Sequence, residues 1–166
     1  MNLPKVSVHG KALLAELSHP PSLSLPSCLH LISSDPLAGL LKRPDTGDTA
    51  FHLLFAHSHR SEETVATLLD ALLLHSPMGV RAVNREGRTP LHVLLSRAAI
   101  PYSMAEKVLA AFPRAASIED SGGYLPLFLA VMHNDERKED SLQLANLVRR
   151  LCQAHPAGPS ALNKTK

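Results

Sequence analysis

The chain has 166 residues, 45% of them hydrophobic, and a formal net charge of +2 with histidine taken as neutral. This composition is typical of a folded domain, and the weak charge, without a block of basic residues, argues against a nucleic-acid-binding protein. No apolar run approaches the ~18 residues of a membrane-spanning helix, so we expect no membrane insertion. Aromatic residues make up 4% and tryptophan is absent, which favours a core of leucine, alanine and valine packed helix on helix.

A short phrase with a leading glycine recurs four times along the chain. Its copies begin at Gly10, Gly47, Gly87 and Gly123, which are 37, 40 and 36 residues apart. Self-similarity at such a period is typical of proteins built from stacked structural repeats. Because a stack of repeats presents an extended surface, the phrase favours binding over catalysis.

Each copy of the phrase opens a unit with two predicted helices. The phrase predicts the first helix, and a later apolar stretch with helical spacing predicts the second. A proline that cannot continue the second helix follows it in every unit, at Pro36, Pro77, Pro113 and Pro156. An Asp or Asn then precedes a hairpin-like turn, at Asp45, Asn84 and Asp120. The sequence therefore predicts an all-α fold of about four stacked helix pairs, a single domain over 1–166 with repeats at approximately 9–45, 46–84, 85–120 and 121–163.

The first unit, 9–45, is the most divergent. Its phrase keeps only the glycine and Leu13, and a proline- and serine-rich loop, 19–27, separates its two predicted helices. Cys28 opens its second apolar stretch, and Cys152 lies far along the chain without a partner motif. Both cysteines fit buried free thiols, so we expect them to be reduced and the location to be cytoplasmic, with the nucleus possible.

The second and third units carry the clearest signals for helix starts. Ser61 is followed by two glutamates, which is typical of an N-cap with acidic residues in the first turn. Thr89 before Pro90 predicts an N-cap hydroxyl and a proline at the first helical position. Ser103 with Glu106 predicts a capping box at the start of the third unit's second helix. We expect the glycine of each phrase to take a positive φ in the turn before its helix.

In the fourth unit, Gly122 and Gly123 fall in the predicted turn and require no ligand. A run of acidic and basic residues, 135–140, is predicted to be a solvated loop between the two helices. Counted on from Asn163, the next phrase glycine would fall at about residue 166, where Lys166 stands. This count leaves two interpretations, a short complete protein, which we favour, or a segment of a longer repeat protein.

The recurring phrase, which is clearest at residues 87–92, resembles the signature of the ankyrin repeat family. The signature positions are matched at Gly47, Thr49 and His52, at Gly87, Thr89, Pro90, Leu91 and His92, and at Gly123, Pro126 and Leu127. The resemblance implies a curved right-handed solenoid of stacked helix pairs, with hairpin tips and first helices lining a concave face. These units are longer than the roughly 33 residues usual in the family. Bulky pairs such as Leu54 and Phe55 also replace its usual alanines, which implies less regular stacking.

The resemblance gives the histidines of the phrase a structural part. It implies that His52 and His92 bond locally to the threonines of their own turns rather than act as catalysts or metal ligands. A zinc site would need His57 and His59 to converge with His52 and a further ligand, and no Cys pair or His-Glu-x-x-His phrase accompanies them. We therefore expect no catalytic residues, no cofactor and no metal.

The variable residues at the predicted hairpin tips are the candidates for contact with a partner, because tyrosine and arginine are enriched at binding hot spots. These candidates are Asp48, Arg85, Glu86, Arg88 and Tyr124. Arg88 and Tyr124 hold the same position in adjacent units, so we expect them to project side by side.

The leading hypothesis is a non-enzymatic protein–protein interaction module, monomeric on its own, whose concave surface binds another protein. One alternative is a scaffold or targeting segment of a larger multidomain signalling or ubiquitin-ligase protein. Another is a metal-dependent enzyme. The sequence does not name the partner, since the surface of a repeat protein differs for each target.

Overall fold

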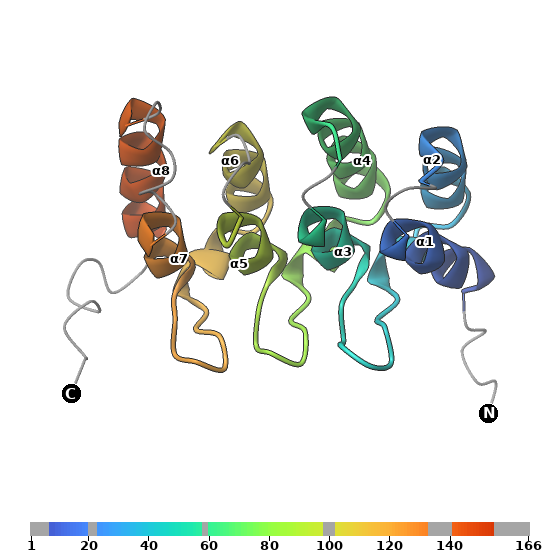
Figure 1. Ribbon diagram of the computed structural model, residues 1–166, viewed down its shortest axis with the longest axis horizontal. Helices are drawn as coiled ribbons and strands as arrows, with labels where there is room; N and C mark the ends of the chain where they lie inside the picture. Colours follow the sequence, from blue (N-terminus) through green and yellow to red (C-terminus); the bar gives the residue numbers. More distant parts are fainter. Residues whose placement is uncertain (1–6, 20–22, 58–59, 98–101, 133–140, 155–166) are drawn as a thin grey trace.

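The computed structural model describes residues 7–19, 23–57, 60–97, 102–132 and 141–154, and this part of the chain is helical without strands, which confirms the predicted all-α class. Its helices lie in pairs set side by side in a row, with the intervening turns projecting on one side (Figure 1). The pairs are α1 (Val8–Ser18) with α2 (Leu25–Ser34), α3 (Ala50–Ala56) with α4 (Glu62–His75), α5 (Pro90–Leu95) with α6 (Tyr102–Ala111), and α7 (Pro126–Met132) with α8 (Ser141–Ala154). None of these helices has the length and apolar character needed to cross a membrane.

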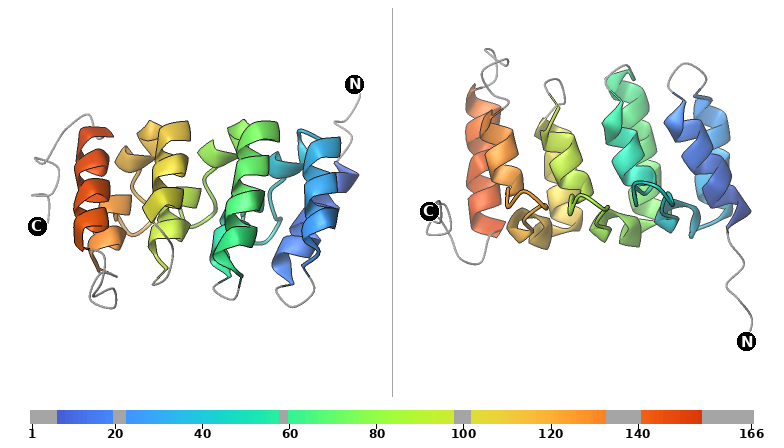
Figure 2. Two further views of the ribbon diagram at one scale, coloured as in Figure 1. Left: turned by 90° about the horizontal axis from the view of Figure 1, so that it is seen from above. Right: turned by 60° about the horizontal axis from the view of Figure 1, so that its bottom comes forward.

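The first helices of the pairs form one layer and the second helices form another (Figure 2). Short 3-10 helices lead from the second layer toward the turns, namely η2 (Ala38–Leu40), η3 (Pro77–Arg81) and η4 (Pro113–Ser117). In the sequence, Pro77 and Pro113 are predicted to end the second helices of their units. Pro77 and Pro113 also begin the 3-10 helices, because the fixed φ of proline suits a first helical position and its missing N–H is not needed there.

One apolar core runs through the row of pairs. Leucines at helical spacing fill it, such as Leu68, Leu69 and Leu72 on α4, which are fully buried. Phe51 and Phe55 on α3 are also fully buried, and burying a side chain of this size contributes roughly 1.5–3 kcal/mol. Since each short pair shares this core with its neighbours, packing between pairs fixes the positions of the turns.

Two predicted helix starts are confirmed. Ser61 is the N-cap of α4 and accepts a hydrogen bond from the Thr64 N–H, with Glu62 and Glu63 in the first turn. Thr89 is the N-cap of α5, and Pro90 is its first residue. Acidic groups in the first turn interact favourably with the positive end of the helix dipole, so the sequence of α4 also supports its own start.

Two other predictions about helix starts are wrong. Gly10 lies inside α1 rather than in a turn, because Ser7 caps this helix by accepting the Gly10 N–H at 2.7 Å. Ser103 does not cap α6, which already begins at Tyr102. The buried ring of Tyr102, 5% exposed, belongs to the apolar face of α6 and extends the helix by one residue ahead of Ser103.

Arg60 joins the ends of two first helices. Its Nη1 donates to the carbonyls of Leu53 and Leu54 on α3, at 2.9 and 3.1 Å, and its Nη2 donates to the carbonyl of Leu17 on α1 at 2.5 Å. The last carbonyls of a helix have no partner within the helix. One half-buried guanidinium therefore caps α1 and α3 together and links the first pair to the second.

Candidate functional site

Three hairpin turns form one edge of the molecule, visible below the helices in Figure 1. Each is closed by a backbone bond across its base: Arg43 N to Asp48 O at 2.8 Å, Asn84 N to Arg88 O at 3.0 Å, and Asp120 N to Tyr124 O at 3.0 Å. The phrase glycines have φ values of 75° at Gly47, 71° at Gly87 and 78° at Gly123, which confirms the predicted left-handed conformation.

Neighbouring turns are bonded to each other. The Arg85 N–H donates to the Thr46 carbonyl, and the Ser121 N–H donates to the Glu86 carbonyl, each at 2.9 Å. The second turn is also held by Asn84, whose Oδ1 accepts the N–H groups of Glu86 and Arg88 at 3.0 Å. These bonds hold the residues at neighbouring turns in fixed positions relative to one another.

The histidines of the phrase join each turn to the next. Nδ1 of His52 accepts the Thr49 N–H at 3.2 Å, which leaves the ring proton on Nε2, and Nε2 then donates to the Arg88 carbonyl at 2.9 Å. His92 makes the same pair of bonds to Thr89 N at 3.1 Å and to the Tyr124 carbonyl at 3.1 Å. The predicted local bond to threonine is thus confirmed, and the second bond, across to the next turn, is an addition from the structure.

The fourth pair lacks this bridge. In the fourth unit Leu125 replaces the threonine of the Thr-x-x-His phrase, and Phe128 replaces its histidine. The ring of Phe128 stacks instead on Tyr124, with 4.7 Å between ring centroids and 14° between planes. The threonine–histidine bridge thus joins the second unit to the third and the third to the fourth.

Burial lowers the pKa of both His52 and His92, and their bonds to the carbonyls of Arg88 and Tyr124 oppose this shift only in part. A protonated ring would also place an N–H at Nδ1 against the N–H of its threonine. The folded state therefore holds both rings neutral, while the unfolded chain takes up protons below the ordinary pKa of 6.5.

We expect the free energy of unfolding to fall as the pH drops below about 6.5, before carboxylates titrate. Urea unfolding at pH 7 and pH 5 measures this loss. His92→Phe, which copies the side chain already present at 128, should show a smaller loss between the two pH values. His30→Phe, at an exposed histidine on α2, should behave like the wild type, and an equal loss in all three proteins would contradict the argument.

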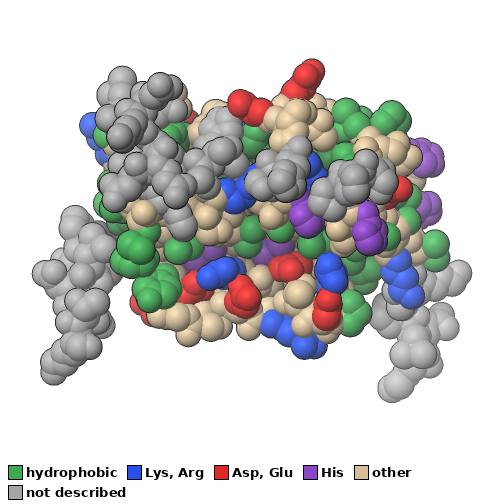
Figure 3. Space-filling view, in the orientation of Figure 1, with side chains coloured by type: hydrophobic (Ala, Val, Ile, Leu, Met, Phe, Trp, Pro, Cys, Tyr) green, Lys and Arg blue, Asp and Glu red, His purple; other side chains and the backbone are tan. Residues whose placement is uncertain are grey.

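A groove of about 240 Å³ lies between the turns and the first helices α3 and α5. It is lined by three predicted partner-contact residues, Asp48, Glu86 and Arg88, together with His52 and Phe55 of α3, Val93 of α5 and several neighbours. Figure 3 shows acidic and basic side chains gathered over the turns on this face. The structure thus brings three of the five predicted residues to one opening.

Arg88 is the centre of the charges at this groove. Its Nη1 lies 3.1 Å from a Glu86 carboxylate oxygen, and its Nε lies 3.4 Å from Asp120 Oδ2 in the next turn. Burial alone would raise the pKa of Asp120, but hydrogen bonds from the backbone N–H groups of Tyr124 and Gly122 and from Arg88 outweigh it and lower the pKa. Asp120 therefore stays ionised and orients the guanidinium.

The other two predicted residues lie elsewhere. The Nη2 of Arg85 donates to the Pro44 carbonyl at 2.6 Å, so its side chain reaches back over the preceding turn. Tyr124 takes in its turn the place that Arg88 takes in the preceding one, but its ring turns to Phe128 and does not line the groove. Tyr124, 46% exposed, joins an apolar cluster with Phe128, Val131 and Met132 on and before α7.

Within the described residues, no group of three or more His, Cys, Asp and Glu side chains is placed to hold a metal ion. Both ring nitrogens of His52 already bond to the protein. His59, the loop 135–140 and the segment with Pro156 and Asn163 lie outside the described residues. Cys28 is a buried free thiol, and burial together with the charge of Glu16 raises its pKa to about 11, which makes it a poor nucleophile.

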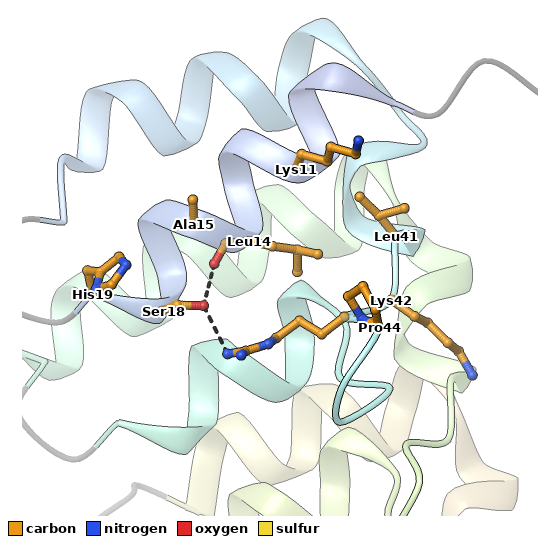
Figure 4. Close-up of a pocket in the computed structure, with 9 residues that line it drawn as sticks. Lys11, Leu14, Ala15, Ser18, His19, Leu41, Lys42 and Pro44 are labelled. Atoms are coloured by element: carbon orange, nitrogen blue, oxygen red, sulfur yellow. Dashed lines mark hydrogen bonds between the residues drawn. The ribbon is translucent and has the colours of Figure 1, made fainter.

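A second hollow, of about 600 Å³, lies beside α1 (Figure 4). Leu14 of α1 points toward Leu41 and Pro44 of the segment that leads into the first turn, and Ala15 also lines the hollow. The other lining residues are Lys11, Ser18, His19, Lys42 and Arg43. Counted from the start of the phrase, Ala15 corresponds to His52, and its short side chain leaves open the space that an imidazole would occupy.

Sequence reasoning missed several of these residues. Asp120 could have been found, because it precedes its turn as Asn84 precedes the turn before. Lys11 and Leu41 carried no such signal, since only the fold brings α1 beside residues 41–44.

No family model matches the chain, and no curated protein matches it.

Proposed function

We propose that this chain is an ankyrin-type repeat solenoid that binds another protein and has no enzymatic activity. The observation that carries the proposal is the groove beside Arg88, where variable charged residues are exposed on turns that are bonded to one another. Pre-ordered charged groups at an open surface suit recognition of a complementary protein surface. In the second and third units threonine and histidine are bonded within the framework, which leaves the neighbouring positions for the partner.

The apolar cluster at α7 extends this proposed surface. Figure 3 shows hydrophobic atoms at the α7 end of the same face. Stacked Tyr124 and Phe128 are 46% and 39% exposed, and aromatic side chains that remain at a surface are frequent anchors of protein interfaces. The proposed contact surface thus combines a charged part at Arg88 with an apolar part at Tyr124. We propose a monomer acting in the cytoplasm, with the nucleus possible.

The double variant Arg88→Ala/Tyr124→Ala should lose the partner. The purified wild type, immobilised and cross-linked in a cell lysate, should retain one or a few proteins that the variant does not retain. The matched control is Leu74→Ala/Lys107→Ala, which removes one exposed apolar and one exposed basic side chain from α4 and α6 in the second layer. Equal retention by the wild type and by both variants would contradict the proposed surface.

A further inference from the structure

We propose that the hollow beside α1 binds an acidic segment of a partner protein, in which an apolar side chain is flanked by carboxylates. This inference rests on the proposed function and names the chemistry of the partner. At about 600 Å³ the hollow is in the size range of ligand-binding sites, and it is larger than the 240 Å³ groove at Arg88. Leu14, Ala15, Leu41 and Pro44 give it an apolar floor for one side chain of the segment.

Every charged side chain that lines the hollow is basic. These are Lys11 on α1 and Lys42 and Arg43 on the opposite segment, with His19 at one end. The groove at Arg88 differs, because Asp48 and Glu86 line it as well and Glu86 pairs with Arg88 inside it. The hollow therefore has a positive charge that its own lining does not neutralise.

The contacts of these basic residues leave most of that charge available. The ammonium of Lys42 donates to the Val83 carbonyl at 2.7 Å, which is neutral. Arg43 makes a two-point pair with the Asp45 carboxylate, through Nε at 2.9 Å and through Nη2, so its charge is neutralised and the available charge is that of Lys11 and Lys42. Glu16, the acid nearest on α1, accepts a hydrogen bond from the Ser24 N–H and does not line the hollow.

The positions of the charges favour a peptide over a small amphiphile. Lys11 lies on α1 and Lys42 lies on the opposite segment, so a ligand that meets both must place anionic groups on both sides of an apolar one. From Lys11 to Ser18 α1 rises roughly 10 Å, which about three residues of extended chain can span. A short sequence of acid, apolar residue and acid has this spacing, whereas a fatty acid carries one carboxylate at one end.

The experiment selects binders from a random heptapeptide library displayed on phage, with the purified wild-type chain as bait. The enriched peptides are then synthesised, and their dissociation constants are measured by fluorescence anisotropy. We expect Leu, Met or Phe flanked by Asp or Glu. Binding should weaken at least about tenfold in Lys11→Glu/Lys42→Glu, where like charges oppose each other. Raising the salt concentration should also weaken it.

Ala15→Trp fills the hollow from the exposed side of α1 and should weaken binding by a similar factor. The matched controls are Arg114→Glu/Arg149→Glu on η4 and α8, and Ala110→Trp on the exposed side of α6; both should bind within about twofold of the wild type. Thermal unfolding of each variant verifies that it is folded before its affinity is compared.

Several results would overturn the inference: no enrichment, enriched peptides without acidic residues, or affinities unchanged by both hollow variants. Saturable binding of dodecanoate without selection of acidic peptides would also overturn it and assign the hollow to a small amphiphile. The proposed function and the inference about the hollow can fail independently of each other. If Arg88→Ala/Tyr124→Ala loses the captured partner while the hollow selects nothing, the binding module stands and the acidic segment does not.

Discussion

Gly87→Ala should lower the free energy of unfolding by about 3 kcal/mol, of which roughly 1–2 kcal/mol comes from forcing a side chain into the left-handed region. The remainder comes from the next turn. An added Cβ would lie 2.7 Å from the Ser121 backbone nitrogen and 3.1 Å from the Asp120 carbonyl carbon. Because Ser121 N–H bonds to the Glu86 carbonyl at 2.9 Å, the turns cannot separate without losing that bond.

Gly123→Ala is the matched control. Gly123 has a similar φ of 78°, but nothing lies within 4 Å of the position that its Cβ would take. It should therefore lose only the conformational part, roughly 1–2 kcal/mol. Urea unfolding curves of both variants measure the difference directly. Equal losses would mean that the turns do not pack on one another as the structure has them.

Arg60→Met should lower the free energy of unfolding by about 3 kcal/mol, because three helix-end carbonyls lose a charged donor at once. Methionine keeps much of the length and apolar packing of the arginine stem, so the loss reports mainly the hydrogen bonds. The affected carbonyls belong to Leu17 on α1 and to Leu53 and Leu54 on α3. We expect the first pair of helices to loosen earliest, as faster amide exchange in α1.

Arg43→Met is the control for removing a positive charge. Arg43 pairs with Asp45 at the surface, and such a pair is worth at most about 1 kcal/mol. Its bond to Ser18 Oγ, at 3.3 Å, is long. If Arg43→Met and Arg60→Met lose the same stability in thermal or urea unfolding, the bonds from Arg60 do not join α1 to α3.

The sequence was sufficient for features whose signal is local. The turn glycines, the caps at Ser61 and Thr89, and the hydrogen bond that His92 accepts from Thr89 all depend on residues within a few positions of one another. Gly10 was predicted wrongly for the same reason. Its phrase keeps the glycine of the others, but Ser7 lies three residues ahead and starts the helix earlier.

Features that join separate units could not be derived in this way. The bond from His52 to the Arg88 carbonyl spans 36 residues, and the bond from Arg60 to the Leu17 carbonyl spans 43. The direction of the Tyr124 ring depends on Phe128, one helical turn further on. The five predicted contact residues are all placed at turns, yet their side chains divide between the groove, the preceding turn and the α7 cluster.

These contacts separate the residues that hold the framework from those proposed to meet the partner. Thr89 and His92 are buried and bonded to the protein. Arg88 and Tyr124 are at the surface beside them, partly or largely exposed. The two groups are adjacent in sequence, so Arg88 and Tyr124 can be substituted without removing the bonds that build their turns.

The most direct measurement is the affinity of two variants for the captured partner, at a temperature where both are folded. His92→Phe should lower the melting temperature and keep the wild-type affinity. Arg88→Ala/Tyr124→Ala should lose about 1 kcal/mol of stability or less and bind at least about tenfold more weakly. The reverse pattern, with affinity lost in His92→Phe and kept in Arg88→Ala/Tyr124→Ala, would contradict the account.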